Sequence, residues 1–145
     1  MAAVTTPVAS GLAAEDYATG YDLNPGDTIP ADKLGKVVCT GADECTCEGT
    51  CPADLSADND AFTTIVARMQ AIDPSITEDN VQVVYQGSGL GFAGDPGGMD
   101  VSPLVTVRLT GMTFKSIATL ALISLPMPQF AATLTAEDLA GVNSN

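Results

Sequence analysis

The segment NDAFTTIVARMQAIDPSITEDNVQVVY, residues 59–85, predicts a helix followed by a strand, and it decides the fold class. Its apolar side chains recur at relative positions 0, 3, 4, 7 and 10, which is one face of an α-helix. They are Phe62, Ile65, Val66, Met69 and Ile72. Asp58 and Asp60 suit the positive N-terminus of this helix, and Asp73-Pro74 ends it. Residues 81–85 then alternate as a half-buried strand does.

Strand patterns continue toward the C-terminus. Residues 101–112 place Val105, Val107 and Leu109 on one face of a strand, and the glycine-rich residues 87–98 before them predict a long hairpin loop. Residues 116–124 fit either a short helix or a buried strand, which periodicity does not separate. After a break at 126–128, residues 129–135 again predict a strand.

The N-terminal residues 4–19 predict a second helix with a thin apolar stripe. Thr6-Pro7 suits its start, and Gly20 suits its end. The stripe consists of Val8, Leu12, Ala13 and Tyr17. The sum is an α+β fold, with two helices on one face of a mainly antiparallel sheet of three or four strands.

The length of 145 residues predicts one domain over 1–145. We divide it into the N-terminal helix (1–20), a cysteine-containing loop (21–58), a helix plus sheet (59–138) and a tail (139–145). Inside the loop, Val37-Val38 fits a short strand.

Four cysteines lie close together in this loop, at Cys39, Cys45, Cys47 and Cys51. Their spacing matches neither zinc nor iron–sulfur sites, so we interpret them as two disulfides that shape the loop. The neighbouring acidic residues raise thiol pKa values and so argue against redox chemistry. Pairings 39–45 with 47–51 and 39–47 with 45–51 both remain open, because only a 45–47 bridge is too strained.

The net charge of −13 and the absence of histidine exclude several functions. Five Lys or Arg residues cannot form the basic surface that nucleic acids require. Without histidine there is no Ser-His-Asp or Cys-His arrangement, so we expect no enzyme, no catalytic residues and no cofactor. The longest apolar run, residues 117–125, is about half of the roughly 20 residues that span a bilayer, and no signal peptide is recognisable.

Two further motifs are better explained by structure than by ligand binding. The acidic residues Asp54, Asp58 and Asp60 lack the spacing, the central glycine and the final glutamate of a calcium loop. Gly87-Ser-Gly89-Leu-Gly91 lacks the lysine and the following helix of a phosphate-binding loop. We therefore predict no metal site here.

Several segments resemble the C-terminal part of TadE-like pilus-assembly proteins from alphaproteobacteria. The segments are FTTIVARMQAID (62–73), NVQVVY (80–85), GSGLGFAGD (87–95), VSPLVTVRLTG (101–111) and LPMPQFAATLTAED (125–138). The resemblance covers about residues 60–140, and FAATLTAED (130–138) is its most telling part. The family's N-terminal membrane helix and processing motif are missing here, so residues 4–19 would continue that helix in a pilin-like arrangement.

The resemblance implies a non-enzymatic part of the tight-adherence (Flp type IVb) pilus system. It implies a periplasmic or pilus-associated location, anchored to the inner membrane through the missing helix, and other assembly subunits as partners. We expect strand edges and five apolar residues to make the contacts: Phe62, Ile65 and Met69 on the helix and Leu90 and Phe92 in the glycine-rich loop. The alternative is a periplasmic or secreted ion-binding module that uses the acidic or cysteine loop.

Overall fold

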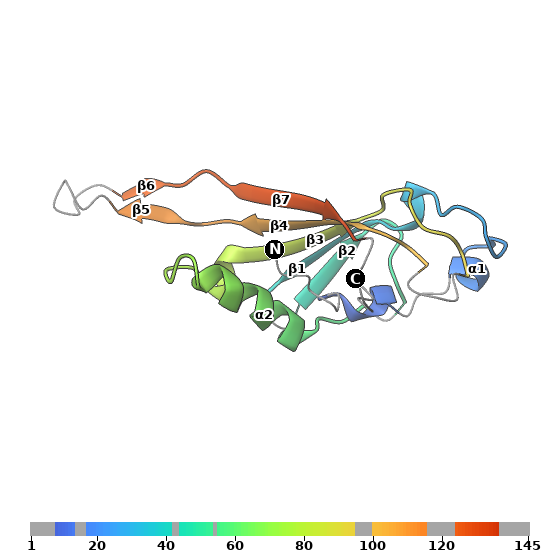
Figure 1. Cartoon of the computed structure of the whole chain (residues 1–145), viewed down its shortest axis with the longest axis horizontal. Coiled ribbons are helices and arrows are strands. Elements are labelled where there is room, and N and C mark those ends of the chain that lie inside the picture. The colour runs from blue at the N-terminus through green and yellow to red at the C-terminus, as the bar shows by residue number, and fades with distance from the viewer. Residues whose placement is uncertain are drawn as a thin grey trace, which may run out of the picture.

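The computed structural model describes residues 8–13, 17–41, 44–53, 55–94, 100–115 and 124–136. They form an antiparallel five-stranded sheet in the order β2-β1-β3-β4-β7 and a separate two-stranded ribbon, β5-β6 (Figure 1). The sheet strands are β1 (Lys36–Thr40), β2 (Glu44–Glu48), β3 (Val81–Gln86), β4 (Leu104–Leu109) and β7 (Phe130–Thr135). The ribbon consists of β5 (Thr113–Lys115) and β6 (Ser124–Pro126). The predicted strands at 81–85 and 129–135 are confirmed.

The two faces of the sheet differ in polarity, and the strand register shows how. Val37, Val83 and Val107 share one face, since residues opposite each other in antiparallel strands point the same way. This face, here called the apolar face, also carries the residues in register with them, namely Cys39, Cys45, Cys47, Val81, Tyr85, Val105, Leu109, Phe130, Ala132 and Leu134. The opposite face is mostly polar and carries Lys36, Glu48 and Arg108. The core therefore lies on the apolar face.

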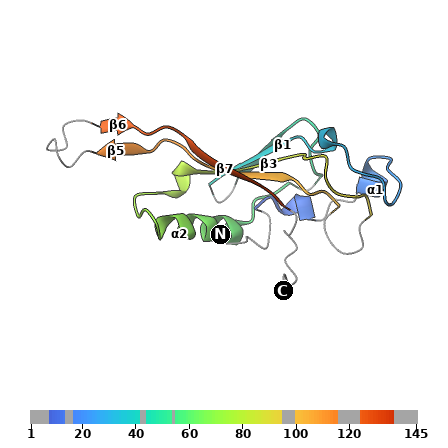
Figure 2. The same ribbon diagram turned by 45° about the horizontal axis from the view of Figure 1, so that its top comes forward.

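The predicted helix is confirmed as α2 (Asn59–Gln70), which packs on the apolar face beside β1 and β3 (Figure 2). The Asp58 carboxylate accepts a hydrogen bond of 2.9 Å from the Ala61 backbone N–H, which caps the helix N-terminus. Phe62 is completely buried and joins Val83 and Tyr85 in the core. Ile72 differs from the prediction. It lies beyond the end of the helix and is 89% exposed.

The expected N-terminal helix over 4–19 is not observed as a continuous helix. The described residues form a bend at Val8, a 3-10 turn η1 (Ser10–Ala13) and a single turn α1 (Tyr17–Gly20). The Val8 N–H bonds to the Tyr85 hydroxyl, and the Ser10 N–H bonds to the Ser56 carbonyl. Short isolated helices are marginal, so these long-range bonds and burial of the stripe outweigh helix formation. Residues 1–7 and 14–16 lie outside the described residues.

The cysteine-containing segment is a hairpin and not a loop, which is why the sheet has five strands where we expected three or four. A 3-10 turn, η2 (Ala31–Lys33), leads into β1, which pairs with β2 on one side and with β3 on the other. The sequence predicted only Val37-Val38 as strand, because residues 44–48, a run of Cys, Thr and Glu, have no strong strand pattern. Pairing with β3 supplies what the local sequence lacks.

The β5-β6 ribbon continues the β4-β7 hairpin. Leu109 pairs with Phe130, and Thr113, four residues later, pairs with Pro126, four residues before Phe130, so the register is unbroken. Met127 donates to the Met112 carbonyl between the two paired regions. The ribbon projects past the C-terminal end of α2 in both views (Figures 1 and 2). Residues 116–123 and 137–145 lie outside the described residues, and with them most of the 116–124 segment and the expected tail.

Candidate protein interaction surface

The two edges of the five-stranded sheet differ in their chemistry. At one edge, β2 carries Glu44 and Glu48, which point to the polar face and flank Thr46. The disulfides Cys39–Cys45 and Cys47–Cys51 tie the same strand to β1 and to the segment that follows it. Charged side chains and covalent ties are common ways of protecting a strand edge from another chain. The β2 edge is therefore a protected one.

The other edge is β7, and it has none of these protections. Its sequence FAATLT contains no charged residue, no proline and no glycine, and all six of its side chains are exposed. No Asp, Glu, Lys or Arg occurs anywhere between Lys115 and Glu137, in a chain that carries 23 charged residues. Figure 1 shows β7 along the upper border of the sheet, with no described strand beyond it. An uncharged edge strand of this kind is open to pairing with another strand.

The backbone orientation of β7 shows which of its groups face outward. The Ala136 N–H bonds to the Pro103 carbonyl at 2.9 Å, in line with the β4-β7 register. Main-chain groups alternate between the two sides of an antiparallel strand. The N–H and C=O of Ala131, Thr133 and Thr135 therefore point away from β4. These three residues form the hydrogen-bonding edge, here called the β7 edge.

The apolar face extends to this edge. Phe130 and Leu134 are 51% and 54% exposed. They lie in register with Leu109 and Val105 of β4, which are only half-buried and pack against the core. Burying apolar area contributes about 25 cal/mol per Å², so covering these side chains is favourable. Edge and apolar face together can accept a partner strand.

The structure separates the five predicted contact residues into two groups. Phe62 and Ile65 are buried and Met69 is half-buried, so this face of α2 packs against its own sheet and is not open to a partner. Leu90 and Phe92 are 46% and 56% exposed. They lie in the connection between β3 and β4, and nothing in the described residues places them on the β7 edge.

The glycine-rich connection is tied down by backbone hydrogen bonds. The Ala93 N–H bonds to the Asp27 carbonyl, and the Ile29 N–H bonds to the Gly91 carbonyl. Gly91 has a φ of +109°, and a Cβ there would overlap the Asp100 carbonyl oxygen. Gly91 therefore allows close backbone packing within the connection between β3 and β4.

The cysteines pair as Cys39–Cys45 and Cys47–Cys51, which selects one of the two open pairings. Cys39 and Cys45 lie opposite each other in the register, with Cα atoms 4.0 Å apart. No thiol is free among the described residues, and no group of three or more His, Cys, Asp or Glu residues there could hold a metal ion. Of the three acidic residues weighed as a calcium loop, Asp58 caps α2, Asp60 lies in its first turn, and Asp54 lies outside the described residues.

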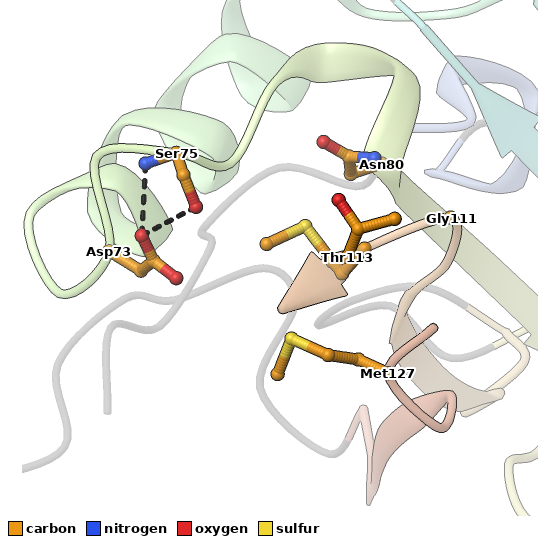
Figure 3. A pocket seen from close by; sticks show the side chains of 7 residues that line it. Asp73, Ser75, Asn80, Gly111, Thr113 and Met127 are labelled. Atoms are coloured by element: carbon orange, nitrogen blue, oxygen red, sulfur yellow. Dashed lines mark hydrogen bonds between the residues drawn. The ribbon is translucent and has the colours of Figure 1, made fainter. Parts of the chain in front are cut away.

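A shallow hollow of about 490 Å³ lies beside the loop that follows α2 (Figure 3). Its described lining is Asp73, Ser75, Asn80, Gly111, Met112, Thr113 and Met127. One Asp73 oxygen accepts hydrogen bonds from the Ser75 backbone N–H at 2.9 Å and from its hydroxyl at 2.7 Å. These bonds lower the Asp73 pKa. A single carboxylate held in a local turn lacks the six to eight oxygen ligands of a calcium site, so we assign the hollow no ligand.

No helix among the described residues is long and apolar enough to cross a membrane. Comparison with protein-family models, with curated proteins and with solved structures finds no match to this chain.

The sequence carries a signal for the β7 edge, because no charged residue lies in or beside the strand predicted at 129–135. Whether a strand lies inside a sheet or at its edge depends on long-range strand order, which one strand's composition does not give.

Proposed function

We propose that this chain is a non-enzymatic assembly module of a tight-adherence pilus system, which acts through contacts between protein subunits. The observation that carries the proposal is the β7 edge, an uncharged and fully exposed strand at one border of a sheet whose other border is protected. Strand addition to such an edge is a common mode of subunit recognition, because main-chain hydrogen bonds bind and alternating side chains select.

Two further observations support the proposal. The resemblance to TadE-like proteins includes FAATLTAED (130–138), which contains β7 itself. The two disulfides fit a compartment outside the cytosol, since disulfides persist where the surroundings are oxidising. We propose the periplasm or the pilus as that location, with an inner-membrane anchor in the full-length protein.

The proposal is tested by affinity capture from cells that carry the native gene with a tag. Recovery of other tight-adherence components supports it, provided that a Leu134→Glu variant with unchanged disulfides recovers fewer of them. Leu134 is 54% exposed on the edge strand, so the variant changes the surface more than the fold. Recovery of no pilus component by the unmodified chain contradicts the proposal.

No observation in the described residues favours the alternative of an ion-binding module. All four cysteines are paired in two disulfides, and the Asp58 carboxylate caps a helix. Elemental analysis combined with a thiol titration separates the two functions. No bound metal and no reactive thiol agrees with the assembly module, whereas a stoichiometric metal ion would favour the alternative.

A further inference from the structure

We propose that the partner of the β7 edge is a second copy of this chain, paired strand to strand in antiparallel register about a two-fold axis at Thr133. Two five-stranded sheets then join into one continuous sheet with β7 of each copy at its centre. This deepens the proposed function, on which it rests for its role in the cell, but it is tested on the purified chain alone.

The register follows from which residues face outward. Ala131, Thr133 and Thr135 present their N–H and C=O groups to the open edge. An axis at Thr133 pairs Thr133 with Thr133 of the second copy and Ala131 with Thr135 of the second copy. Every outward residue then meets another outward residue, which gives about six main-chain hydrogen bonds. An axis at Ala132 would instead pair Thr135 with Gln129, which lies outside the strand.

The side chains are self-complementary in the same register. Residues opposite each other point to the same side, so Ala132 lies beside Leu134 of the second copy on the apolar face. The small Ala132 and the large Leu134 thus lie side by side at two symmetry-related places, and the half-exposed Leu134 becomes more buried. On the polar face Thr133 meets Thr133 of the second copy, and threonine pairs across strands are favourable. Thr133 already shares a 2.8 Å hydroxyl bond with Thr106 within one chain.

Charge also favours a second copy over a charged partner. A basic partner would be recognised through acidic side chains, but β7 has no charge of either sign. Two copies with a net charge of −13 repel each other over most of their surface, and β7 is the part where they can approach without facing charges. The β2 edge, with Glu44 and Glu48, would place like charges against each other in a similar pairing.

The contact is small, so the dimer is weak. A six-residue strand is about 20 Å long, and one strand pair falls below the interface of roughly 1,200–2,000 Å² that stable complexes bury. We expect a dissociation constant on the order of 10⁻⁴ M. Since the axis uses the same surface on both copies, association stops at the dimer.

Sedimentation velocity on the purified, disulfide-intact chain, up to millimolar concentration, tests the inference. The Thr133→Pro variant removes an outward N–H, which edge strands tolerate, and leaves the main-chain bonds to β4 in place. It also removes the hydroxyl bond to Thr106, so Thr133→Val, which loses the same hydroxyl, is its control. Relative to Thr133→Val, we expect Thr133→Pro to weaken the dimer at least tenfold with little difference in melting temperature. The matched Ala132→Pro variant removes an inward N–H and should lower the melting temperature. Added NaCl should tighten the wild-type dimer, because it screens the repulsion between the two acidic chains.

Amide hydrogen exchange gives a second readout that needs no variant. Exchange at Ala131, Thr133 and Thr135 should slow as the concentration of the wild-type chain rises, while Cys45 and Cys47, whose N–H groups point away from β1 at the β2 edge, stay unchanged. A chain that remains monomeric at millimolar concentration overturns the inference, and so does a dimer that Thr133→Pro leaves intact or whose β7 amides gain no protection. A chain that stays monomeric but still captures other pilus components would overturn the inference and leave the proposed function standing, so the two proposals fail separately.

Discussion

Removal of one hydroxyl, Tyr85→Phe, tests how the N-terminal segment is held to the sheet. Tyr85 is 2% exposed, and its hydroxyl oxygen accepts a 2.8 Å hydrogen bond from the Val8 backbone N–H. Phenylalanine keeps the packing of the ring but leaves this buried N–H without its partner. An unsatisfied buried donor costs about 1–3 kcal/mol, so the free energy of unfolding near neutral pH should fall by about 2 kcal/mol.

The same hydroxyl makes stability depend on alkaline pH. Burial raises the pKa of Tyr85 from 10.0 to about 12, while hydrogen bonds from the Val8 and Ala9 backbone act in the opposite direction. The unfolded chain therefore loses this proton at a lower pH than the folded chain does. The contribution of the neutral Tyr85 hydroxyl to the free energy of unfolding is fully present below pH 10 and is lost as the pH rises through about 12. A difference of about two pKa units corresponds to at most about 3 kcal/mol.

Urea unfolding followed by far-ultraviolet circular dichroism measures both effects, near neutral pH and near pH 11, with short exposure to alkali to protect the disulfides. We expect wild type to lose stability between these pH values and Tyr85→Phe to lose less. Tyr21→Phe is the comparison, because Tyr21 is only partly buried and loss of its hydroxyl should cost less than loss of the Tyr85 hydroxyl. Equal urea midpoints for wild type and Tyr85→Phe near neutral pH would refute the reasoning, as would identical losses at high pH.

Three further predictions concern the helix and the disulfides. Phe62→Ala should cost about 3–5 kcal/mol in thermal unfolding because Phe62 is fully buried, whereas Ile72→Ala, at 89% exposure, should stay within about 0.5 kcal/mol. Asp58→Ala should cost about 1 kcal/mol in urea unfolding through loss of the helix cap, and Asp58→Ser should recover most of it. A mild reductant followed by alkylation and mass spectrometry should open Cys47–Cys51 before Cys39–Cys45, because Cys51 is exposed and Cys39 is fully buried; opening in the reverse order would contradict this.

The elements that could be predicted from the sequence are those whose signal is local. The helix at 59–70 follows from four apolar residues on one face, an aspartate cap and an Asp-Pro stop, and each acts within a few residues. The strand at 81–86 follows from alternation alone. The two disulfides were predicted from cysteine number and spacing, but their pairing needed the hairpin register that places Cys39 opposite Cys45.

The elements that could not be predicted depend on contacts between distant residues. The stripe of Val8, Leu12 and Tyr17 suits a helix, and all three residues are buried as an apolar stripe should be. Burial alone does not specify a helix, however. The Val8 N–H donates to the Tyr85 hydroxyl and the Ser10 N–H donates to the Ser56 carbonyl, so these groups are hydrogen-bonded without a helix. The apolar stripe thus predicted the core residues correctly and the backbone conformation incorrectly.

The same dependence on distant residues explains why the contacts were expected on α2 and why the structure favours β7. Phe62 and Val83 are both apolar and lie in the same core cluster. The apolar side chains of α2 are therefore buried against the chain's own sheet. β7 is last in the order β2-β1-β3-β4-β7, so its outer groups have no strand to pair with among the described residues, although its composition resembles that of an inner strand. β7 has the apolar, uncharged composition of an inner strand but lies at the edge of the sheet, so Phe130 and Leu134 are exposed to water. A strand paired with β7 would bury part of this apolar surface, which is favourable. The position of β7 in the sheet, more than its sequence, is therefore what makes it a site of association.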